Sequence, residues 1–155
     1  MKKIILIILT IITVTCTLNA QTNYSIAGTW RYVNNNDTII MYFKPDTLHI
    51  GTEILNIHLG FHKFVKNGTL IDNTLNFSNT TYSQKKASIY MFGNEPSDAR
   101  EDGHIEDYTL NNRRYIILKK INPTTINVTL NYIQGVRNNQ PYGFTMPRHF
   151  TLTKQ

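Results

Sequence analysis

The sequence predicts an all-β fold, an antiparallel up-and-down barrel of about eight to nine short strands. Apolar and polar residues alternate through most of the chain after Gly28, as they do in strands that bury one face. Clusters of Asn, Asp, Gly and Pro separate these segments and are typical of turns. The apolar period of an amphipathic helix is nearly absent. A closed barrel is favoured over a sandwich because closure removes exposed strand edges.

Length and composition indicate one globular domain. The chain has 155 residues, of which 41% are hydrophobic and 17% are charged, and it contains no internal repeat of fixed period. The net charge is +6, but Lys2 and Lys3 belong to the N-terminal leader, and the other basic residues are scattered along the chain. Nucleic-acid binding requires basic residues gathered on one face, so we expect no nucleic-acid partner.

Residues 1–20 have the three parts of a secretory signal peptide. Two lysines form the positive part, residues 4–12 are almost wholly aliphatic, and Ala20 is a small residue at the end. We expect cleavage between Ala20 and Gln21, which leaves a barrel domain over residues 21–155 that is periplasmic or secreted. The apolar part is shorter than the roughly 20 residues of a membrane-spanning helix, so we expect no stable membrane span.

Cys16, the only cysteine, offers an alternative to this cleavage. If a lipoprotein peptidase cut before Cys16, lipids on this residue would anchor the protein in a membrane. The preceding Thr13-Val14-Thr15 lacks the Leu and the small residue that such sites usually carry. Cleavage after Ala20 removes Cys16 instead, and the remaining chain then has no disulfide and no thiol for catalysis.

The first predicted strand, residues 25–33, is expected to close one end of the barrel. Ile26, Gly28, Trp30 and Tyr32 share one face of this strand, which we expect to be the inner face. Trp30 is the only Trp of the chain, and a large ring of this kind can fill the closed end of a rolled sheet. Gly28 leaves room beside the indole.

Further strands are expected in order along the chain. Turn-forming residues at 34–37 predict a hairpin, and Pro45 is expected to end the strand that begins at Thr38, because Pro cannot donate to a ladder. Alternation predicts a strand over 54–62, with Leu55, Ile57, Leu59 and Phe61 in the core and the opposite face wet or directed into the lumen. Later strands are expected at 69–77, 88–93, 105–110, 115–121, 125–133 and 149–153.

His58 and His62 are candidate metal ligands because they are four residues apart. In a strand this spacing leaves both on one face but well separated. No carboxylate and no third His lies close enough in sequence to complete the site. We therefore expect two polar residues on a solvated strand face, with no bound metal and no cofactor.

An acidic segment is a candidate Ca²⁺ loop, but its spacing is unsuitable. Counted from Asp98, the third position is Arg100 and the twelfth is Thr109, where a helical-hand loop needs ligands. We expect a solvated acidic loop that is partly neutralised by Arg100, Arg113 and Arg114. Its acidic residues are Glu95, Asp98, Glu101, Asp102, Glu106 and Asp107.

No catalytic set is evident in the sequence. The serines lack the context of a nucleophile elbow, and no combination of Ser, His and acid can be recognised. Glu53 together with Glu101 or Glu106 offers a carboxylate pair of the glycosidase kind, but such pairs arise by chance in any chain with ten acids. We expect a protein that is not an enzyme, and keep an enzyme acting on a glycan or an ester as an outside alternative.

Two resemblances add to this interpretation. Gly28-Thr29-Trp30 resembles the Gly-x-Trp signature of the lipocalins and other calycins, in which the Trp closes the barrel base and an Arg from the last strand lies across it. Arg148 matches that Arg by position. More of the chain resembles a family of small secreted Bacteroidota proteins with a domain of unknown function. That likeness rests on 19–21, 28–32, 71–74, 144–147 and 152–155.

These observations lead to two hypotheses of function. The first is a secreted, monomeric, lipocalin-like barrel that binds a small hydrophobic or amphipathic ligand through its open end, with barrel closure by Gly28, Trp30 and Arg148. The second is a structural or interaction module of the cell envelope, with a filled barrel and an adhesive rim formed by residues 94–103 and 135–143. The interior volume separates the two, because a ligand carrier needs a roomy apolar cavity.

Overall fold

The fold consists almost entirely of β-strands, which confirms the predicted class. The computed structural model describes residues 25–93, 99–132 and 143–155. The strands are β1 Gly28–Asn34, β2 Asp37–Ile50, β3 Glu53–Lys66, β4 Thr69–Asn73, β5 Ile89–Phe92, β6 Arg100–Asp107, β7 Asn112–Asn122, β8 Thr125–Tyr132 and β9 His149–Lys154. Two single-turn 3-10 helices, η1 Leu75–Phe77 and η2 Tyr82–Gln84, connect β4 to β5.

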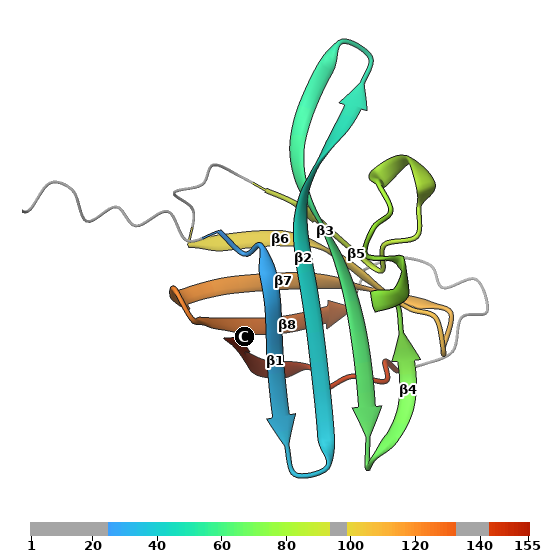
Figure 1. Cartoon of the computed structure of the whole chain (residues 1–155), viewed down its shortest axis with the longest axis vertical. Coiled ribbons are helices and arrows are strands. Elements are labelled where there is room, and N and C mark those ends of the chain that lie inside the picture. Colours follow the sequence, from blue (N-terminus) through green and yellow to red (C-terminus); the bar gives the residue numbers. More distant parts are fainter. Residues whose placement is uncertain (1–24, 94–98, 133–142) are drawn as a thin grey trace, which may run out of the picture.

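Eight of the strands close into an antiparallel barrel, as the sequence predicted. The sheet order is β2-β1-β9-β8-β7-β6-β5-β3-β4, and an additional pairing of β2 with β3 closes the ring. β4 pairs with β3 and stands outside that ring. In Figure 1, β1 to β4 cross β6 to β9 at a steep angle, as expected when a strongly twisted sheet closes on itself. No helix within the described ranges has the length and apolar character needed to cross a bilayer.

The hairpin of β2 and β3 is longer than the barrel is tall. Both strands have 14 residues, and their tip projects beyond the remaining strands (Figure 1). The prediction that Pro45 ends this strand was wrong, since β2 continues to Ile50. The last residue of β2 that pairs with β1 is Phe43, so Pro45 lies where β2 has a free edge. Edge strands tolerate Pro because no neighbouring strand needs its missing N–H.

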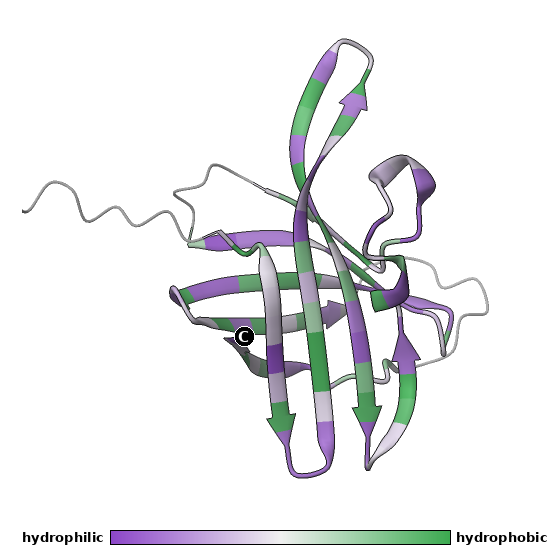
Figure 2. Cartoon of the chain, viewed as in Figure 1, coloured by the Kyte–Doolittle hydropathy of each residue, from purple (hydrophilic) through white to green (hydrophobic). Residues whose placement is uncertain are grey.

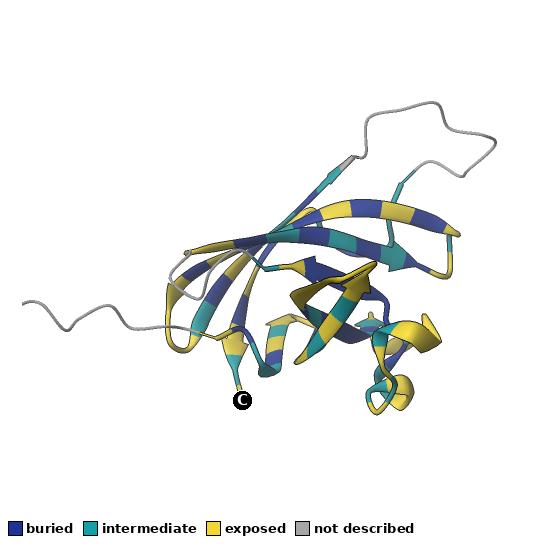
Figure 3. Cartoon of the chain, turned by 90° about the horizontal axis from the view of Figure 1, so that it is seen from above, coloured by how far each residue is buried: buried dark blue, intermediate teal, exposed yellow. Residues whose placement is uncertain are grey.

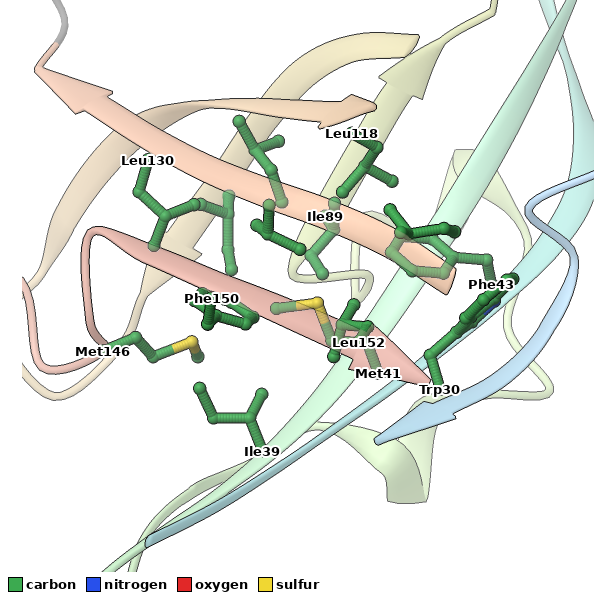
Figure 4. Packing of buried hydrophobic residues seen from close by; sticks show 14 of the residues in the cluster. Trp30, Ile39, Met41, Phe43, Ile89, Leu118, Leu130, Met146, Phe150 and Leu152 are labelled. Carbon is green, nitrogen blue, oxygen red and sulfur yellow. The ribbon is translucent and has the colours of Figure 1, made fainter. Parts of the chain in front are cut away.

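The inner side chains of the barrel pack into one cluster. Burial alternates along the strands, so that every second side chain points inward (Figure 3). Trp30 and Phe43 lie toward one end of this cluster, and Leu130 and Met146 toward the other (Figure 4). The same cluster contains further side chains that are almost completely buried: Met41, Ile89, Ile105, Ile116, Leu118, Ile126, Val128 and Leu152. The barrel is thus filled by interlocking apolar side chains along its axis.

A second apolar cluster lies on the outer wall of the barrel. It contains Ile57, Leu59 and Phe61 of β3, whose apolar positions alternate with polar ones (Figure 2). Ile57, Leu59 and Phe61 are buried as predicted, but Leu55 is 41% exposed, so that prediction was wrong for Leu55. Of the two alternatives for the opposite face, the lumen-directed one holds, because Gly60 and His62 point inward. A Cβ at Gly60 would stand 2.7 Å from the Cβ of Ile89. The outward apolar face is buried because the segment between β4 and β5 covers it, with Leu75, Tyr82 and Ala87 packed against it.

Candidate functional site

The residues expected to close the barrel lie in two different places. Trp30 is 1% exposed, and its Nε1 donates a hydrogen bond of 2.6 Å to the carbonyl of Ile26. Gly28 has a φ of +118° and adjoins Lys154, whose Nζ lies 5.3 Å from the centroid of the Trp30 ring. Arg148 is exposed, and its Nη2 donates to Oδ1 of Asn131. The structure therefore places Lys154 over Trp30, because Lys154 pairs with Trp30 in the ladder and Arg148 precedes β9.

The acidic segment is a strand, so the prediction of a solvated acidic loop was wrong for its described part. Glu101 and Asp107 point inward from β6 and are buried, whereas Asp102 and Glu106 point outward and pair with arginines. Period-two alternation divides the acids between the two faces of the sheet. Glu95, Asp98 and the rest of 94–98 lie outside the described residues, as do residues 135–142 of the second proposed rim segment.

Three ionisable side chains meet inside the barrel. Oε2 of Glu101 lies 3.1 Å from Nδ1 of His58, and its Oε1 accepts from Nζ of Lys120 at 3.4 Å. Both Glu101 and Lys120 are buried, and burial is tolerable for such charges only when they are paired. The expectation of a solvated face for His58 was wrong, since β3 turns this face inward. The mutual pairing of these three side chains is enough to explain why they are buried together.

Ser88, His62 and Asp72 form a relay that sequence reasoning missed. Nδ1 of His62 shares a hydrogen bond of 2.8 Å with Oγ of Ser88, and its Nε2 lies 3.3 Å from Oδ2 of Asp72. Burial raises the pKa of Asp72, but the interaction with His62 and the backbone hydrogen bonds from Asn73 and Tyr108 together outweigh this effect, so the pKa is lowered overall. The order of the groups resembles a nucleophile, a base and an orienting acid.

The surroundings of this relay indicate a fastening role. His62 and Ser88 are 0% exposed, so Oγ of Ser88 offers no surface to a substrate. Oγ1 of Thr74 accepts from the His62 amide at 2.7 Å, and the Thr74 amide donates to the His62 carbonyl. The Ser88 amide donates to the carbonyl of Gly60. Both ends of the segment 74–88 are thereby fixed to β3.

The middle of the same segment has its own anchors. Oδ2 of Asp46 accepts a hydrogen bond of 2.8 Å from the Tyr82 amide. Thr81 and Gln84 form a capping box around η2, which satisfies the free amides at its start. Lys85 then adopts a left-handed φ of +51° and turns the chain back toward β5. These contacts hold Tyr82 and Lys85 above the outer wall.

Two hollows flank Tyr82 on this outer wall. One has a volume of about 470 Å³ and lies between η2 and the projecting part of β2; its lining is Asp46, Thr47, Leu48, His49, Thr81, Tyr82 and Ser83. The other has a volume of about 410 Å³ and lies between η2 and the outer faces of β5, β6 and β7; its lining is Tyr82, Lys85, Tyr90, Phe92, His104, Glu106 and Arg113. We call the second one the aromatic hollow. Volumes of this size suit small-molecule ligands.

Rings form the floor and one side of the aromatic hollow. Tyr82 meets Tyr90 edge to face, with 5.8 Å between ring centroids and an interplanar angle of 87°. Tyr90 stacks on His104 at 5.1 Å, and Phe92 lies 5.7 Å from His104 in a tilted arrangement. Phe92 is nonetheless 41% exposed, so part of this apolar surface faces solvent. Contacts between the rings fix their orientation before any ligand arrives.

The aromatic hollow is lined by one ion pair and by a further cation, Lys85. Glu106 and Arg113 form an ion pair across β6 and β7. Burial lowers the pKa of His104, and the charge of Arg113 lowers it further, so the imidazole is neutral at pH 7. Burial also raises the pKa of Tyr90 to about 12, which keeps its hydroxyl protonated. The hollow therefore offers ring faces next to hydrogen-bonding groups, a combination suited to an amphipathic molecule.

A family model decides the relationship of this chain to other proteins. The model for DUF6705, a family of unknown function, matches residues 1–155. The chain belongs to this family. Searches of curated proteins and of solved structures found no match. For this DUF6705 protein, an assignment of function therefore rests on the geometry described above.

Metal binding finds no support in the geometry of this DUF6705 protein. Within residues 25–93, 99–132 and 143–155, no group of three or more His, Cys, Asp or Glu side chains is placed to hold a metal ion. His58 and His62 each interact with a different acid, Glu101 and Asp72. The sequence could not have indicated the aromatic hollow, since its residues come from η2 and three separate strands.

Proposed function

We propose that the protein is an exported, non-enzymatic, lipocalin-like barrel that binds a small amphipathic ligand in the aromatic hollow. The ring-lined space of about 410 Å³ carries this proposal. Tyr90, Phe92 and His104 supply apolar ring surface, and Glu106 with Arg113 supplies acceptors and donors beside it. This combination of many apolar contacts with a few polar groups is common in small-molecule sites.

The packing of the interior supports a site on the outer wall. A lipocalin-like carrier would hold its ligand in the lumen, but the inward side chains from Trp30 to Met146 form one apolar cluster. Residues 143–148 lead over the end of the barrel opposite Trp30, where Thr145 donates two hydrogen bonds to Asp107 and Met146 joins the cluster. Binding through that end would require displacing these side chains.

Burial of the relay supports a role without catalysis. Ser88 hydrogen-bonds to His62, which in turn contacts Asp72, and Ser88 is 0% exposed at the end of the segment 74–88. A nucleophile must reach its substrate as well as its base. Export is supported by the leader in residues 1–20, and mass spectrometry of the exported protein is expected to give Gln21 as the first residue; a chain that stays uncut in the cytoplasm would contradict this part of the proposal.

Calorimetric and NMR titration with laurate, haem and short oligosaccharides tests the proposed site. We expect at least one of these compounds to bind and to shift the amide signals of Tyr90, Phe92 and His104. Phe92→Ala should weaken that binding about tenfold, because an exposed ring surface is lost. Phe77→Ala is the matched control, since Phe77 is also 41% exposed but lies on η1. If no compound binds, or if Phe77→Ala has the same effect, the hollow is not the site.

The envelope module remains a second candidate because of two observations. The first is the filled barrel interior, which this hypothesis includes. Ile50, Ile54 and Leu55 at the tip of the β2–β3 hairpin are exposed, and apolar tips of this kind are frequent in protein contacts. Pull-down from envelope extracts with the wild-type protein and with Ile54→Asn tests it. Loss of a captured protein in the variant would favour the module, while equal capture by both would exclude the tip.

A further inference from the structure

We propose that the ligand is an uncharged linear oligosaccharide that lies across β5, β6 and β7, from the aromatic hollow to Tyr115. This inference rests on the proposed function, because it starts from the same hollow and names the chemical class that the hollow accepts. It adds Tyr115 and the pair of Arg100 and Asp102, none of which lines the hollow itself.

Three rings occupy one row across neighbouring strands. Tyr90 pairs with His104, and His104 pairs with Tyr115, so their side chains point to the same outer face at the same height. Neighbouring strands are about 4.8 Å apart, so Tyr90 and Tyr115 are separated by roughly 10 Å. That distance is close to the length of a disaccharide unit. A chain of sugars can therefore extend from the hollow, where Tyr90 is largely covered by Tyr82, over His104 to Tyr115.

Hydrogen-bonding groups border the row on both sides. On one side Glu106 pairs with Arg113, and on the other side Nε of Arg100 lies 2.7 Å from Oδ1 of Asp102. The two arginines remain more than half exposed, at 58% and 52%, so they keep donors for a ligand. A sugar ring has an apolar C–H face and a rim of hydroxyls that both donate and accept. The row of rings can contact the apolar C–H face, and the bordering ion pairs can hydrogen-bond to the hydroxyls.

Charge balance favours a neutral sugar over other amphipathic ligands. Each bordering arginine has its own carboxylate. Lys85 at the hollow and Lys119 beside Arg100 add two positive charges, which are fewer than the clustered cations that a nucleic acid or a polyanion requires. A fatty acid would cover these polar groups with hydrocarbon and leave their hydrogen bonds unmade, which is costly. Tyr115 at one end of the row is 37% exposed, and Phe92, which lies beside His104, is 41% exposed, so both present ring surface to solvent. Tyr90 at the other end is only 8% exposed.

NMR titration with four uncharged tetrasaccharides tests the proposal: cellotetraose, maltotetraose, xylotetraose and chitotetraose. We expect at least one to bind with shifts at Tyr90, His104 and Tyr115, with an affinity that changes little between low and high salt. Tyr115→Ala should weaken this binding several-fold to tenfold by removing one stacking ring. Tyr115→Phe should restore most of it, and Phe77→Ala should leave it unchanged.

The remaining outcomes separate this inference from the function on which it rests. If laurate or haem binds in a manner that requires Phe92 and no tetrasaccharide binds, the oligosaccharide is excluded and the amphipathic-ligand site stands. If a tetrasaccharide binds but Tyr115→Ala has no effect, the row across β5 to β7 is excluded as its binding surface. If binding of a charged hyaluronan tetrasaccharide exceeds that of all four neutral sugars, the uncharged class is overturned. If nothing binds, both proposals fail.

Discussion

The inner and outer apolar clusters of this protein share strand β3 but differ in how they are closed. The inner cluster is enclosed by eight strands, and most of its side chains have no measurable exposure. The outer cluster has strand on one side only and is covered by the segment 74–88. That segment is held by a few hydrogen bonds at Thr74, Tyr82 and Ser88. Folding of the barrel therefore depends on the inner cluster, whereas the outer cluster mainly determines the shape of the outer wall.

The difference explains where the hollows lie. In this barrel, apolar side chains from the closed ring of eight strands fill the interior, which leaves little space there for a ligand. A covering segment that touches the wall along only part of its length leaves openings at its edges. Both hollows lie at such edges and share Tyr82. The attachment of the segment 74–88 at only a few points therefore creates the hollows on the outer wall, in one of which we propose that a ligand binds.

The largest effect is expected from damage to the inner cluster. Trp30→Ala should lower the free energy of unfolding by about 3–5 kcal/mol, because it removes the largest fully buried ring and leaves a cavity that the strands cannot collapse. Urea denaturation followed by circular dichroism measures this change. Tyr115→Ala, on the exposed face of β7, should cost far less. A small effect of Trp30→Ala would mean that the inner cluster does not hold the barrel together.

A smaller and more local effect is expected from the outer fastening. Thr74→Val keeps the shape of the side chain but removes the hydroxyl that accepts from the His62 amide, which should cost about 1–3 kcal/mol. Hydrogen exchange should accelerate mainly within residues 75–87, and ligand binding should weaken because Tyr82 loses its support. Thr153→Val on β9 is the control. Equal acceleration in all strands would contradict the distinction between the two clusters.

Much of the barrel could be predicted because its determinants are local. Alternation around Trp30 and the turn residues at 34–37 and 67–68 depend on neighbours in sequence, and the strands follow them. The face of β3 could not be predicted, since both faces are buried there and the alternation alone does not say which face is inside. Pro45 was misjudged because a free edge depends on where another strand ends.

The candidate site was much harder to predict, for reasons of distance along the chain. His62 meets Thr74 and Ser88 at separations of 12 and 26 residues, and a Ser–His–acid relay is not recognisable at such spacings. Tyr90 and His104 look like ordinary alternating strand residues until the register pairs them. Lys154 took the place over Trp30 because of the pairing of β1 with β9, which the family resemblance could not specify.

The smallest effect is expected from the pH dependence of stability that His104, in the aromatic hollow on the outer wall, produces. The pKa of His104 is lowered from its usual 6.5 by burial and by Arg113, while Glu106 opposes this shift. Well above pH 6.5 the imidazole is neutral in both the folded and the unfolded chain, so His104 adds no pH dependence to the free energy of unfolding there. As the pH falls below 6.5, His104 is protonated in the unfolded chain before it is protonated in the folded chain. The free energy of unfolding therefore falls until the pH passes the lowered pKa of His104 in the folded chain. Urea titrations between about pH 5 and 8 should show this decline, and it should be reduced in His104→Gln. His149→Gln, at an exposed position, is the control. An unchanged pH profile in His104→Gln would mean that the pKa of His104 is the same in the folded and the unfolded chain, which would contradict its burial in the floor of the aromatic hollow.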